Sequence, residues 1–446
     1  MAGTDMRISV IGTGYLGAVH AACLADIGHD VLGVDVDAAK IEALAAGQAP
    51  FYEPGLSDVL SRAVGSGRLR LSIDPAQAAE FADVHFICVG TPQQPGSQAA
   101  DLTYVHAAID GLARHLRRPT LVVGKSTVPV GTAAALARRL AELAPAGEGV
   151  ELAWNPEFLR EGYAVADTLT PDRLVVGARS DAADEALREV YAPMLAAGVP
   201  YIRTDLATAE LVKVAANAFL ATKISFINAV ADVCDAAGAD VVRLAEAMGH
   251  DARIGRRFLG AGVGFGGGCL PKDIRAFLAR ARELGVADSL AFLAEVDTIN
   301  TGRRRRVVEL ARELVGGSLH GRNVAVLGAA FKPDSDDVRD SPALAVAAAV
   351  QARGANVRVH DPAAIDNARA VFPELDYTTD VAKACERADV VLHLTEWREY
   401  RDLEPESLAK VVAHARIVDG RNVLSLERWE AANWTVAALG RGRRQG

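Results

Sequence analysis

One short segment near the start of the chain constrains the fold more than any other. In RISVIGTGYLG, residues 7–17, an apolar run precedes three glycines, Gly12, Gly14 and Gly17. A helix-like stretch follows, and a second apolar run, HDVLGVD, ends at Asp35. A strand, a G-x-G-x-x-G turn, a helix and an acid about 20 residues further on together predict a dinucleotide-binding βαβ unit.

The residues of this turn have separate predicted roles. The glycines allow a tight turn, the close approach of a pyrophosphate, and close packing of the helix on the strand. The free N–H groups at the start of the helix favour a phosphate there. Asp35 would accept hydrogen bonds from a ribose 2′-hydroxyl and repel a 2′-phosphate, so the sequence favours NAD over NADP as the cofactor.

The C-terminal third repeats this layout. NVAVLGAAF (323–331) parallels ISVIGTGYL, GANVRVHDP (354–362) parallels GHDVLGVDV, and ADVVLHLT (388–395) parallels ADVHFICV. Matches in the same order predict an α/β fold with two Rossmann-like, doubly wound units. The second copy reads GAA at 328–330, so we expect that it does not hold a second dinucleotide in the same way.

A long helix is predicted between the two units. Residues 205–240 contain no proline, are rich in Ala, Leu and Lys, and reach their first glycine at Gly238. A shorter helix over 241–249 follows. A helix this long that joins two α/β units predicts a dimer spine, and the alternative is a helix that packs only within its own chain.

Composition and charge exclude several classes of protein. The net charge of −9 argues against a nucleic-acid binder, and the basic run 303–306 is interpreted as a solvated helix segment. The five cysteines are scattered without a C-x-x-C, which predicts reduced thiols and no metal site. The start of the chain is unlike a secretory signal, and the best membrane candidate, 343–350, is far shorter than the ~18 residues a membrane helix needs. We therefore expect a cytoplasmic protein without a membrane partner.

Two pairs of side chains are candidates for chemistry. Lys213 and Asn217 are one turn apart on the long helix, where they could donate together to an oxyanion or form an ordinary surface pair. Glu157 and Glu161 follow the strand-like run VELAW, and strand ends are where doubly wound sheets place ligands.

Cys269 is the candidate nucleophile. It follows five glycines in GVGFGGGCLPKD, and glycine lets a ligand or a backbone come close to the thiol. A nearby cation, Lys272 or Lys213, would favour the thiolate form. An inert buried cysteine is the alternative.

These motifs stand in an order that resembles the UDP-glucose/GDP-mannose dehydrogenase family over about residues 7–425. The motifs that carry the resemblance are GTGYLG, VGTP (89–92), KSTVPVGT (125–132), NPEFLREG (155–162), ELVKVAANAFLATKISFIN (210–228), RIG (253–255), GFGGGCLPKD (264–273), FKPDSDDVRDSP (331–342) and DGRN (419–422). Together they are very specific.

The resemblance implies a two-step oxidation of the primary alcohol of a nucleotide sugar to a carboxylate with two NAD. Cys269 would form a thiohemiacetal and then a thioester, with its glycines leaving room for the sugar C6 beside the sulfur. Lys213 and Asn217 would stabilise the oxyanion. Asp273 and Thr127 would organise water and proton transfer, and Glu157 would act as an acid or base.

The resemblance also implies binding residues. NAD would contact Gly12, Gly14, Tyr15, Leu16, Gly17, Asp35, Lys40, Thr91, Thr127, Glu161, Lys272 and Arg339. The nucleotide sugar would contact Glu157, Phe158, Leu159, Arg160, Glu161, Lys213, Asn217, Phe258, Leu259, Gly260, Ala261, Gly262, Gly266, Lys332 and Arg421. Arg253 would reach the site of the neighbouring subunit in a homodimer.

The predicted domains are an NAD-binding Rossmann domain (1–204), a central helical dimerisation domain with the cysteine loop (205–302) and a Rossmann-like UDP-sugar-binding domain (303–446). The chain departs from the family pattern at Gly268, where serine is common, and at Ala229, where an acid is common. The segment 90–105 most resembles the UDP-glucose branch. GDP-mannose and UDP-N-acetylmannosamine remain open as substrates, as do a single-hydride oxidoreductase and an NAD-binding regulator.

Overall fold

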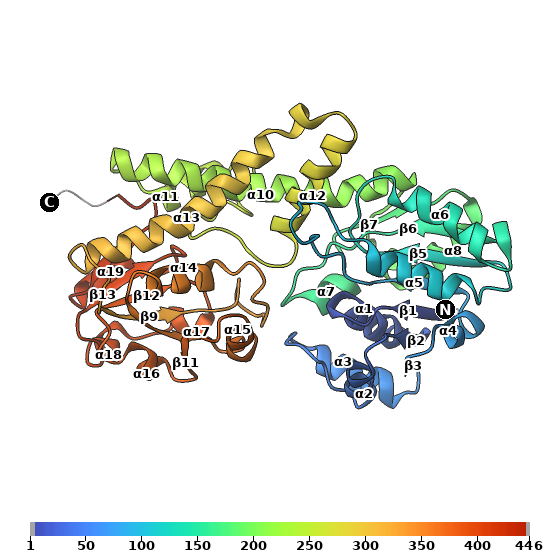
Figure 1. Ribbon diagram of the computed structural model, residues 1–446, viewed down its shortest axis with the longest axis horizontal. Helices are drawn as coiled ribbons and strands as arrows, with labels where there is room; N and C mark the ends of the chain where they lie inside the picture. The colour runs from blue at the N-terminus through green and yellow to red at the C-terminus, as the bar shows by residue number, and fades with distance from the viewer. Residues whose placement is uncertain (1–4, 443–446) are drawn as a thin grey trace. The chain divides into compact units, whose positions relative to one another are not determined.

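The computed structural model describes residues 5–442, which form two compact units (Figure 1). The first contains the chain up to Ala216 together with Ala279–Leu284. The second contains Asn217–Leu278 and the chain from Gly285 onward. Each has a Rossmann-like parallel sheet, and the long helix α10 (Leu206–Ala237) joins the two units.

The first unit is built on an eight-stranded sheet in the order β3-β2-β1-β4-β5-β6-β7-β8. Its strands are β1 (Arg7–Ile11), β2 (Asp30–Val34), β3 (Leu69–Ser72), β4 (Val84–Ile87), β5 (Thr120–Gly124), β6 (Val150–Trp154), β7 (Leu174–Gly177) and β8 (Tyr201–Thr204). Every neighbouring pair is parallel except β6 and β7. The reversal at β1, between β2 and β4, marks the switch point beside which doubly wound sheets bind ligands.

Helices cover both faces of this sheet. They are α1 (Tyr15–Asp26), α2 (Ala38–Ala45), α3 (Leu56–Gly65), α4 (Pro75–Phe81), α5 (Thr103–Ala113), α6 (Thr132–Leu143), α7 (Ala164–Leu169), α8 (Asp181–Val190) and α9 (Ala192–Ala196). Ile8 and Val10 of β1 pack in one apolar cluster and Ile11 in another. Because successive side chains of a strand point to opposite faces, the sheet is buried on both sides.

The second unit has a six-stranded, fully parallel sheet in the order β11-β10-β9-β12-β13-β14. Its strands are β9 (Asn323–Leu327), β10 (Asn356–His360), β11 (Asp376–Thr378), β12 (Val390–His393), β13 (Arg416–Asp419) and β14 (Thr435–Ala438). The first four strand positions, read from the edge, repeat the 3-2-1-4 order of the first unit, as the internal echo predicts. The predicted α/β class with two Rossmann-like units is confirmed.

The helices of the second unit include those that carry the cysteine loop. They are α11 (Val241–Gly249), α12 (Leu270–Glu283), α13 (Phe292–Leu314), α14 (Pro342–Gln351), α15 (Ile365–Val371), α16 (Val381–Cys385), α17 (Arg398–Arg401), α18 (Pro405–Leu408) and α19 (Leu426–Ala431). The short helix predicted over 241–249 is α11. The last five residues of α12, from Ala279, group with the first unit.

The helix α10 is also the segment of the described chain that is long and apolar enough to cross a membrane. Length and composition are the only basis for this, and the core helix of a soluble protein passes the same test. The sequence pointed instead to 343–350, which lies in the ten-residue helix α14.

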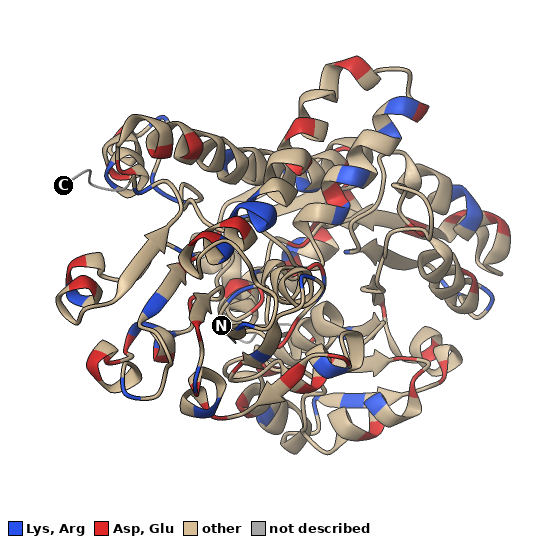
Figure 2. Ribbon diagram, turned by 60° about the vertical axis from the view of Figure 1, so that its left-hand side comes forward, with Lys and Arg blue, Asp and Glu red and all other residues tan. Residues whose placement is uncertain are grey.

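The structure corrects the interpretation of the arginine run 303–306. The run is helical, within α13, but Arg303 is only 2% exposed and donates to Gly262 O at 3.3 Å and to Asp232. Arg304 is ion-paired with Asp340 at 2.9 Å. These arginines therefore hold the fold together, while basic and acidic residues elsewhere are interspersed along the chain (Figure 2).

Candidate active site

The turn after β1 has the three glycine environments that a dinucleotide fingerprint requires. Gly12 has φ +87°, and a Cβ there would lie 2.7 Å from a side-chain atom of Val89. A Cβ on Gly17 would lie 1.8 Å from Gly12 O, so this glycine allows the helix to pack on the strand. Around Gly14 a Cβ would meet nothing within 4 Å, which leaves open space at the start of α1. Tight turn, close packing and open space are therefore separated as the sequence predicts.

Asp35 lies at the end of β2 and is tied to this turn. Its Oδ2 accepts hydrogen bonds from Thr13 N at 2.8 Å and from Lys40 Nζ at 3.1 Å. Burial by itself raises the pKa of Asp35, but the N–H groups of Asp37 and Thr13 and the Lys40 ammonium outweigh burial and lower it. The structure thus brings Asp35 and Lys40 together beside the glycine turn and keeps the carboxylate ionised.

Two predicted threonines meet at the ends of neighbouring strands. Thr91 follows β4 and Thr127 follows β5, and the Thr91 hydroxyl donates to Thr127 O at 2.8 Å. The carboxyl ends of parallel strands lie at one edge of a sheet, which explains why residues 36 positions apart are in contact.

The NPEFLREG segment (155–162) follows β6 and holds the first charged pair. The Glu157 carboxylate forms an ion pair with Lys213 Nζ at 3.0 Å and accepts Leu159 N–H at 2.8 Å. Lys213 is 5% exposed, and its ammonium also lies 5.6 Å from the centre of the Phe158 ring. Arg160 points away into an ion pair with Asp167 at 2.7 Å. An acid and an amine in a dry environment are suited to proton transfer and oxyanion stabilisation.

Cys269 differs from the other four cysteines of the chain. It is exposed, whereas Cys23, Cys88, Cys234 and Cys385 are buried. Burial raises the pKa of Cys23, Cys88 and Cys385 to about 12, so these thiols are inert at neutral pH. Cys269 directly precedes α12, and its carbonyl accepts Asp273 N–H at 3.0 Å. The start of a helix stabilises negative charge, and so it favours a thiolate.

Asp273 connects three of the predicted residues. One carboxylate oxygen accepts Asn217 Nδ2 at 2.7 Å and the other pairs with Lys272 Nζ at 2.6 Å. Asp273 and Asn217 are 2% and 7% exposed. The structure therefore brings together Asn217, Lys272 and Asp273, and it places all three within the unit that carries Cys269.

The glycines before Cys269, residues 262–268, here called the glycine loop, pack against protein. A Cβ would lie 2.7 Å from Gly420 O at Gly262, 2.5 Å from Asn300 Oδ1 at Gly264 and 2.3 Å from Asp340 O at Gly266. At Gly267, which has φ +86°, it would lie 2.7 Å from the Phe331 ring. On the side where a Cβ would project, the protein itself fills the space beside these four glycines, so their packing requires glycine without any ligand.

The DGRN motif after β13 clamps the start of this loop. Gly420 O accepts Val263 N–H at 2.8 Å, and Asn422 Nδ2 donates to Ala261 O at 3.1 Å. Arg421 donates to the carbonyls of Leu394, Gly264 and Phe331 and pairs with Glu396. The resemblance implies that Arg421 contacts the nucleotide sugar, and in the structure its guanidinium is engaged with the backbone around the loop.

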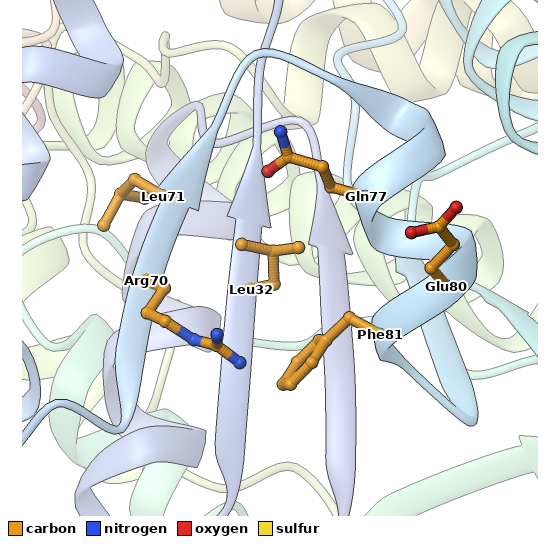
Figure 3. Close-up of a pocket in the computed structure, with 6 residues that line it drawn as sticks. All are labelled: Leu32, Arg70, Leu71, Gln77, Glu80 and Phe81. Atoms are coloured by element: carbon orange, nitrogen blue, oxygen red, sulfur yellow. The ribbon is translucent and has the colours of Figure 1, made fainter.

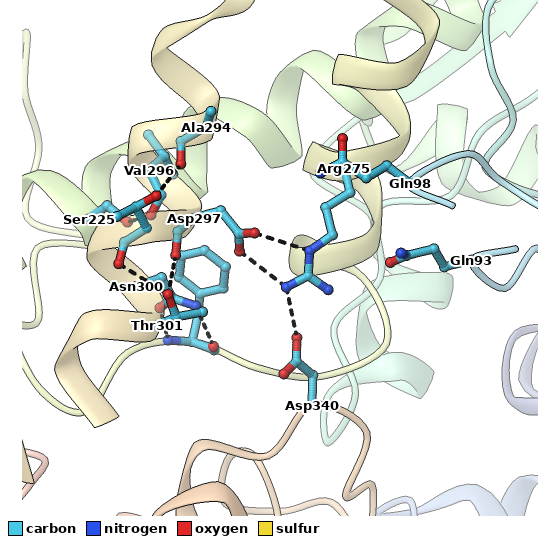
Figure 4. Close-up of polar contacts among 12 residues, drawn as sticks. Gln93, Gln98, Ser225, Arg275, Ala294, Val296, Asp297, Asn300, Thr301 and Asp340 are labelled. Carbon is cyan, nitrogen blue, oxygen red and sulfur yellow. Dashed lines mark hydrogen bonds and ion pairs between the residues drawn. The ribbon is translucent and has the colours of Figure 1, made fainter. Parts of the chain in front are cut away.

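Helix α13 holds the loop from its other side (Figure 4). Asn300 accepts Phe265 N–H at 2.8 Å and donates to Phe265 O at 3.0 Å, as a paired strand would. Nearby, Arg275 of α12 pairs with Asp297 at 3.1 Å and with Asp340 at 3.6 Å. Asp340 has φ +48°, which an aspartate tolerates better than most residues.

The remaining predicted residues lie in two segments of the second unit, around residues 253–261 and 332–339. Arg253 is 88% exposed at its side chain and pairs with Asp251. Phe258 has φ +66°, Leu259 and Ala261 are buried, and Gly260 faces open space. Lys332 lies 5.5 Å from the Phe331 ring, and Arg339 pairs with Asp337 at 2.6 Å.

Models of three domains of one dehydrogenase family match nearly the whole chain. The NAD binding domain matches residues 6–195, the central domain 207–302 and the UDP binding domain 325–426. The chain belongs to the UDP-glucose/GDP-mannose dehydrogenase family. As a member of this family it is an NAD-dependent oxidoreductase, and the glycine turn with Asp35 is the part of the chain that fits NAD.

Individual family members agree with this assignment. A UDP-glucose 6-dehydrogenase of Rhizobium meliloti is 43% identical over 98% of this chain and 100% of its own length. A UDP-glucose 6-dehydrogenase of Bacillus subtilis is 43% identical over 98% of this chain and 93% of its own length. A UDP-glucose dehydrogenase structure from Pyrobaculum islandicum has a TM-score of 0.90 at 41% identity over 97% and 99% of the two chains. A UDP-D-MAnNAc dehydrogenase structure from Pyrococcus horikoshii has a TM-score of 0.86 at 28% identity, over 98% of this chain and 100% of that one.

Several residues that support the family's site were not found from the sequence. Asn300, Asn422 and Glu53 are polar side chains that bind the backbone of the predicted site segments. Their hydrogen-bond partners are 35 to 161 residues away in the sequence, so no local sequence motif predicts these contacts. Among residues 5–442 no cluster of His, Cys, Asp and Glu could hold a metal ion.

A hollow of about 400 Å³ lies elsewhere, on the β2–β3 side of the first sheet (Figure 3). It is lined by Leu32, Arg70, Leu71, Gln77, Glu80 and Phe81, and the Arg70 guanidinium lies 4.4 Å from the centre of the Phe81 ring. Its lining contains none of the predicted site residues, so it is separate from the chemistry above.

Proposed function

We propose that this chain oxidises the primary alcohol at C6 of UDP-glucose to a carboxylate in two two-electron steps, yielding UDP-glucuronate. The observation that carries the proposal is the exposed thiol of Cys269 at the start of α12, one turn from the buried Asp273. A dehydrogenase that stopped at the aldehyde would have no use for an accessible nucleophile there.

The atoms of the reaction balance as follows. The alcohol loses a hydride and a proton and becomes an aldehyde, to which the Cys269 thiolate adds with uptake of a proton. The resulting thiohemiacetal loses a second hydride and proton and becomes a thioester. Water then attacks the carbonyl and the thiolate leaves, which gives the carboxylate. Two molecules of NAD, when bound in turn, would supply the oxidant for the two hydride losses. The sum consumes one water and releases three protons.

Each proposed role follows from a contact already described. Lys213, held at 3.0 Å from Glu157, donates to the developing oxyanion, and Glu157 moves the proton of the alcohol. Asn217 donates to the same oxyanion and is oriented by Asp273. Asp273 and Thr127 organise the attacking water. Lys272, which pairs with Asp273, and Arg339 would contact NAD.

UDP-glucose is the preferred substrate because the resemblance to UDP-glucose dehydrogenases is stronger than to relatives with other sugars. The identities are 38–43% against the former and 26–28% against UDP-N-acetylmannosamine dehydrogenase structures. In the proposal, Lys332 and Arg421 contribute positive charge near the diphosphate, and the segment 258–262 contacts the sugar nucleotide.

NADH release tests the function directly. Purified protein is supplied with UDP-glucose, UDP-N-acetylmannosamine or GDP-mannose, and NADH formed per sugar consumed is measured. We expect two NADH per UDP-glucose and loss of net turnover in Cys269→Ser. One NADH per sugar supports a single-hydride oxidoreductase instead, and undiminished turnover in the serine variant refutes the role given to Cys269. A second check is labelling with iodoacetamide, which should modify Cys269 before the four buried cysteines.

We also propose that the protein is a homodimer built on α10, with Arg253 reaching the neighbouring subunit's site. Phe219, Phe226 and Val233 are exposed, and because they are seven residues apart they form one apolar stripe along the helix. A second copy of the same helix is complementary to such a stripe. Light scattering with Phe226→Asp should show a monomer if the stripe is the interface, and a persisting dimer would exclude it.

Three domains follow from this function: NAD binding over 1–204, dimerisation and the cysteine over 205–302, and UDP-sugar binding over 303–446. We place the reaction in the cytoplasm, because reduced, scattered cysteines and a thiolate nucleophile suit a reducing compartment.

A further inference from the structure

Glu53 is a buried carboxylate that joins two segments of the candidate site. It lies in the loop between α2 and α3 and is 6% exposed. Oε2 accepts Gly162 N–H at 2.6 Å, Oε1 accepts Ala164 N–H at 2.7 Å, and the Tyr15 hydroxyl donates to Oε2. Within the described chain no lysine or arginine lies within ion-pair distance of it, so hydrogen bonds alone stabilise its charge.

The three partners of Glu53 belong to two different segments of the site. Tyr15 is the first residue of α1, directly after the open space at Gly14. Gly162, with φ +78°, follows Glu161 at the end of the NPEFLREG segment. Burial, together with the adjacent Glu53 carboxylate, raises the pKa of Tyr15, so its hydroxyl remains a donor at neutral pH.

A carboxylate suits this position better than any neutral side chain. Three donors converge on two oxygens, and an amide has only one acceptor oxygen. Burying a carboxylate costs free energy unless its hydrogen bonds are complete. The loss of one donor or acceptor therefore also weakens the other two hydrogen bonds.

We infer that Glu53 is a positioning residue that fixes Tyr15 and the 162–164 turn relative to each other, and thereby couples the cofactor turn to the segment that carries Glu157 and Glu161. The inference rests on the proposed function, in which these segments hold NAD and the sugar. Glu53 touches neither ligand; it acts through the Tyr15 hydroxyl and the two N–H groups.

Glu53→Gln tests the inference, and Asp184→Asn is a matched control. Asp184 is another buried carboxylate of the same unit, 5% exposed, and accepts a tyrosine hydroxyl, from Tyr201 at 2.8 Å. The readouts are the melting temperature, the Kd of NADH by fluorescence titration without sugar, and the KM for UDP-glucose. We expect both variants to lower the melting temperature, but only Glu53→Gln to weaken NADH binding and raise KM, each by tenfold or more.

Tyr15→Phe completes a double-mutant cycle and provides a second variant that keeps the carboxylate. Each variant's effect is the factor by which it raises the NADH Kd. If Glu53 acts through Tyr15, the factor for the double variant is at least fivefold smaller than the product of the factors for the two single variants. Multiplying effects, or an NADH Kd in Glu53→Gln within twofold of the parent, would overturn the inference. Because NADH binding is measured without turnover, this outcome is independent of the number of NADH formed per sugar, which tests the proposed function.

Discussion

Gly266→Ala examines whether the glycine loop is packed against the second Rossmann-like unit. Gly266 is not among the glycines with a positive φ, so its φ does not exclude alanine. The added Cβ, however, would lie 2.3 Å from Asp340 O and 2.8 Å from Pro342 Cδ. Asp340 O also accepts a hydrogen bond from Arg304 at 3.2 Å, so this backbone cannot yield without breaking a second contact.

The structure sets the size of the expected effect. Relief of the overlap needs a shift of about 1 Å, and overpacking of this kind costs roughly 1–3 kcal/mol. Weakening the Arg304 hydrogen bond adds about 1 kcal/mol. Alanine lowers the conformational entropy of the unfolded chain, which stabilises the folded state by about 0.5–1 kcal/mol. The net loss is about 1–3.5 kcal/mol, which lowers the melting temperature of a unit of this size by roughly 2–14 °C.

Differential scanning calorimetry of Gly266→Ala is the assay, and Gly268→Ala is its control. At Gly268 the Cβ would meet only the guanidinium of Arg339, the far end of a largely exposed side chain that can move aside. We therefore expect Gly268→Ala to melt within about 2 °C of the parent. If both variants melt like the parent, the loop is not packed as described, and room for a ligand becomes the better reason for the glycine at 266.

Two further predictions concern the first unit. Burial lowers the pKa of Lys125 from its ordinary 10.5 to about 8, so between these values the unfolded chain binds more protons and the free energy of unfolding rises with pH. Denaturant unfolding at pH 7 and pH 10 should show this rise, up to about 3 kcal/mol, in the parent relative to Lys125→Met; a parallel pH dependence in both proteins contradicts it. Asp35→Asn should keep the hydrogen bond from Thr13 N–H but lose the negative charge that repels a 2′-phosphate. The ratio of the NADPH Kd to the NADH Kd should therefore fall at least tenfold in titrations of the variant. An unchanged ratio would exclude Asp35 as the residue that selects NAD.

The fold was predictable because its signals are local. A strand, a glycine turn and a helix within 20 residues determine the centre of the first sheet, and the repeated pattern at 323–361 does the same for the second. Short, continuously apolar strands without strict alternation are typical of a sheet covered on both faces, and the central strands of both sheets are of this kind.

The support of the site was not predictable, because its contacts join distant parts of the chain. A run of glycines shows only that something approaches closely, and the sequence does not say whether this is a ligand or Asn300 and Gly420. Arg303 illustrates the same limit: within four consecutive arginines nothing marks the one whose guanidinium is buried against Gly262 O. Such roles depend on which helix packs beside which loop, and that is decided by tertiary structure.

The two acids that end the second strand of each sheet show what the fingerprint itself reports. Asp361 accepts N–H groups from Ala329 and Ala330 of its turn, just as Asp35 accepts one from Thr13. In both copies the acid therefore first stabilises the turn. Asp361 also accepts bonds from Trp397 Nε1 and two further N–H groups and is 2% exposed, so it has no capacity for a ribose.

The helix that follows the turn makes the functional difference between the copies. In the first, α1 begins three residues after Gly12 and directs its free N–H groups to the open space at Gly14. In the second, α14 begins fourteen residues after Gly328, so the turn has no helix start beside it. The intervening segment contains Phe331 and Asp340, which pack against Gly267 and Gly266. The residues that separate the second turn from its helix thus support the loop that leads to Cys269, and the loss of a dinucleotide cradle and the placement of the thiol have one structural origin.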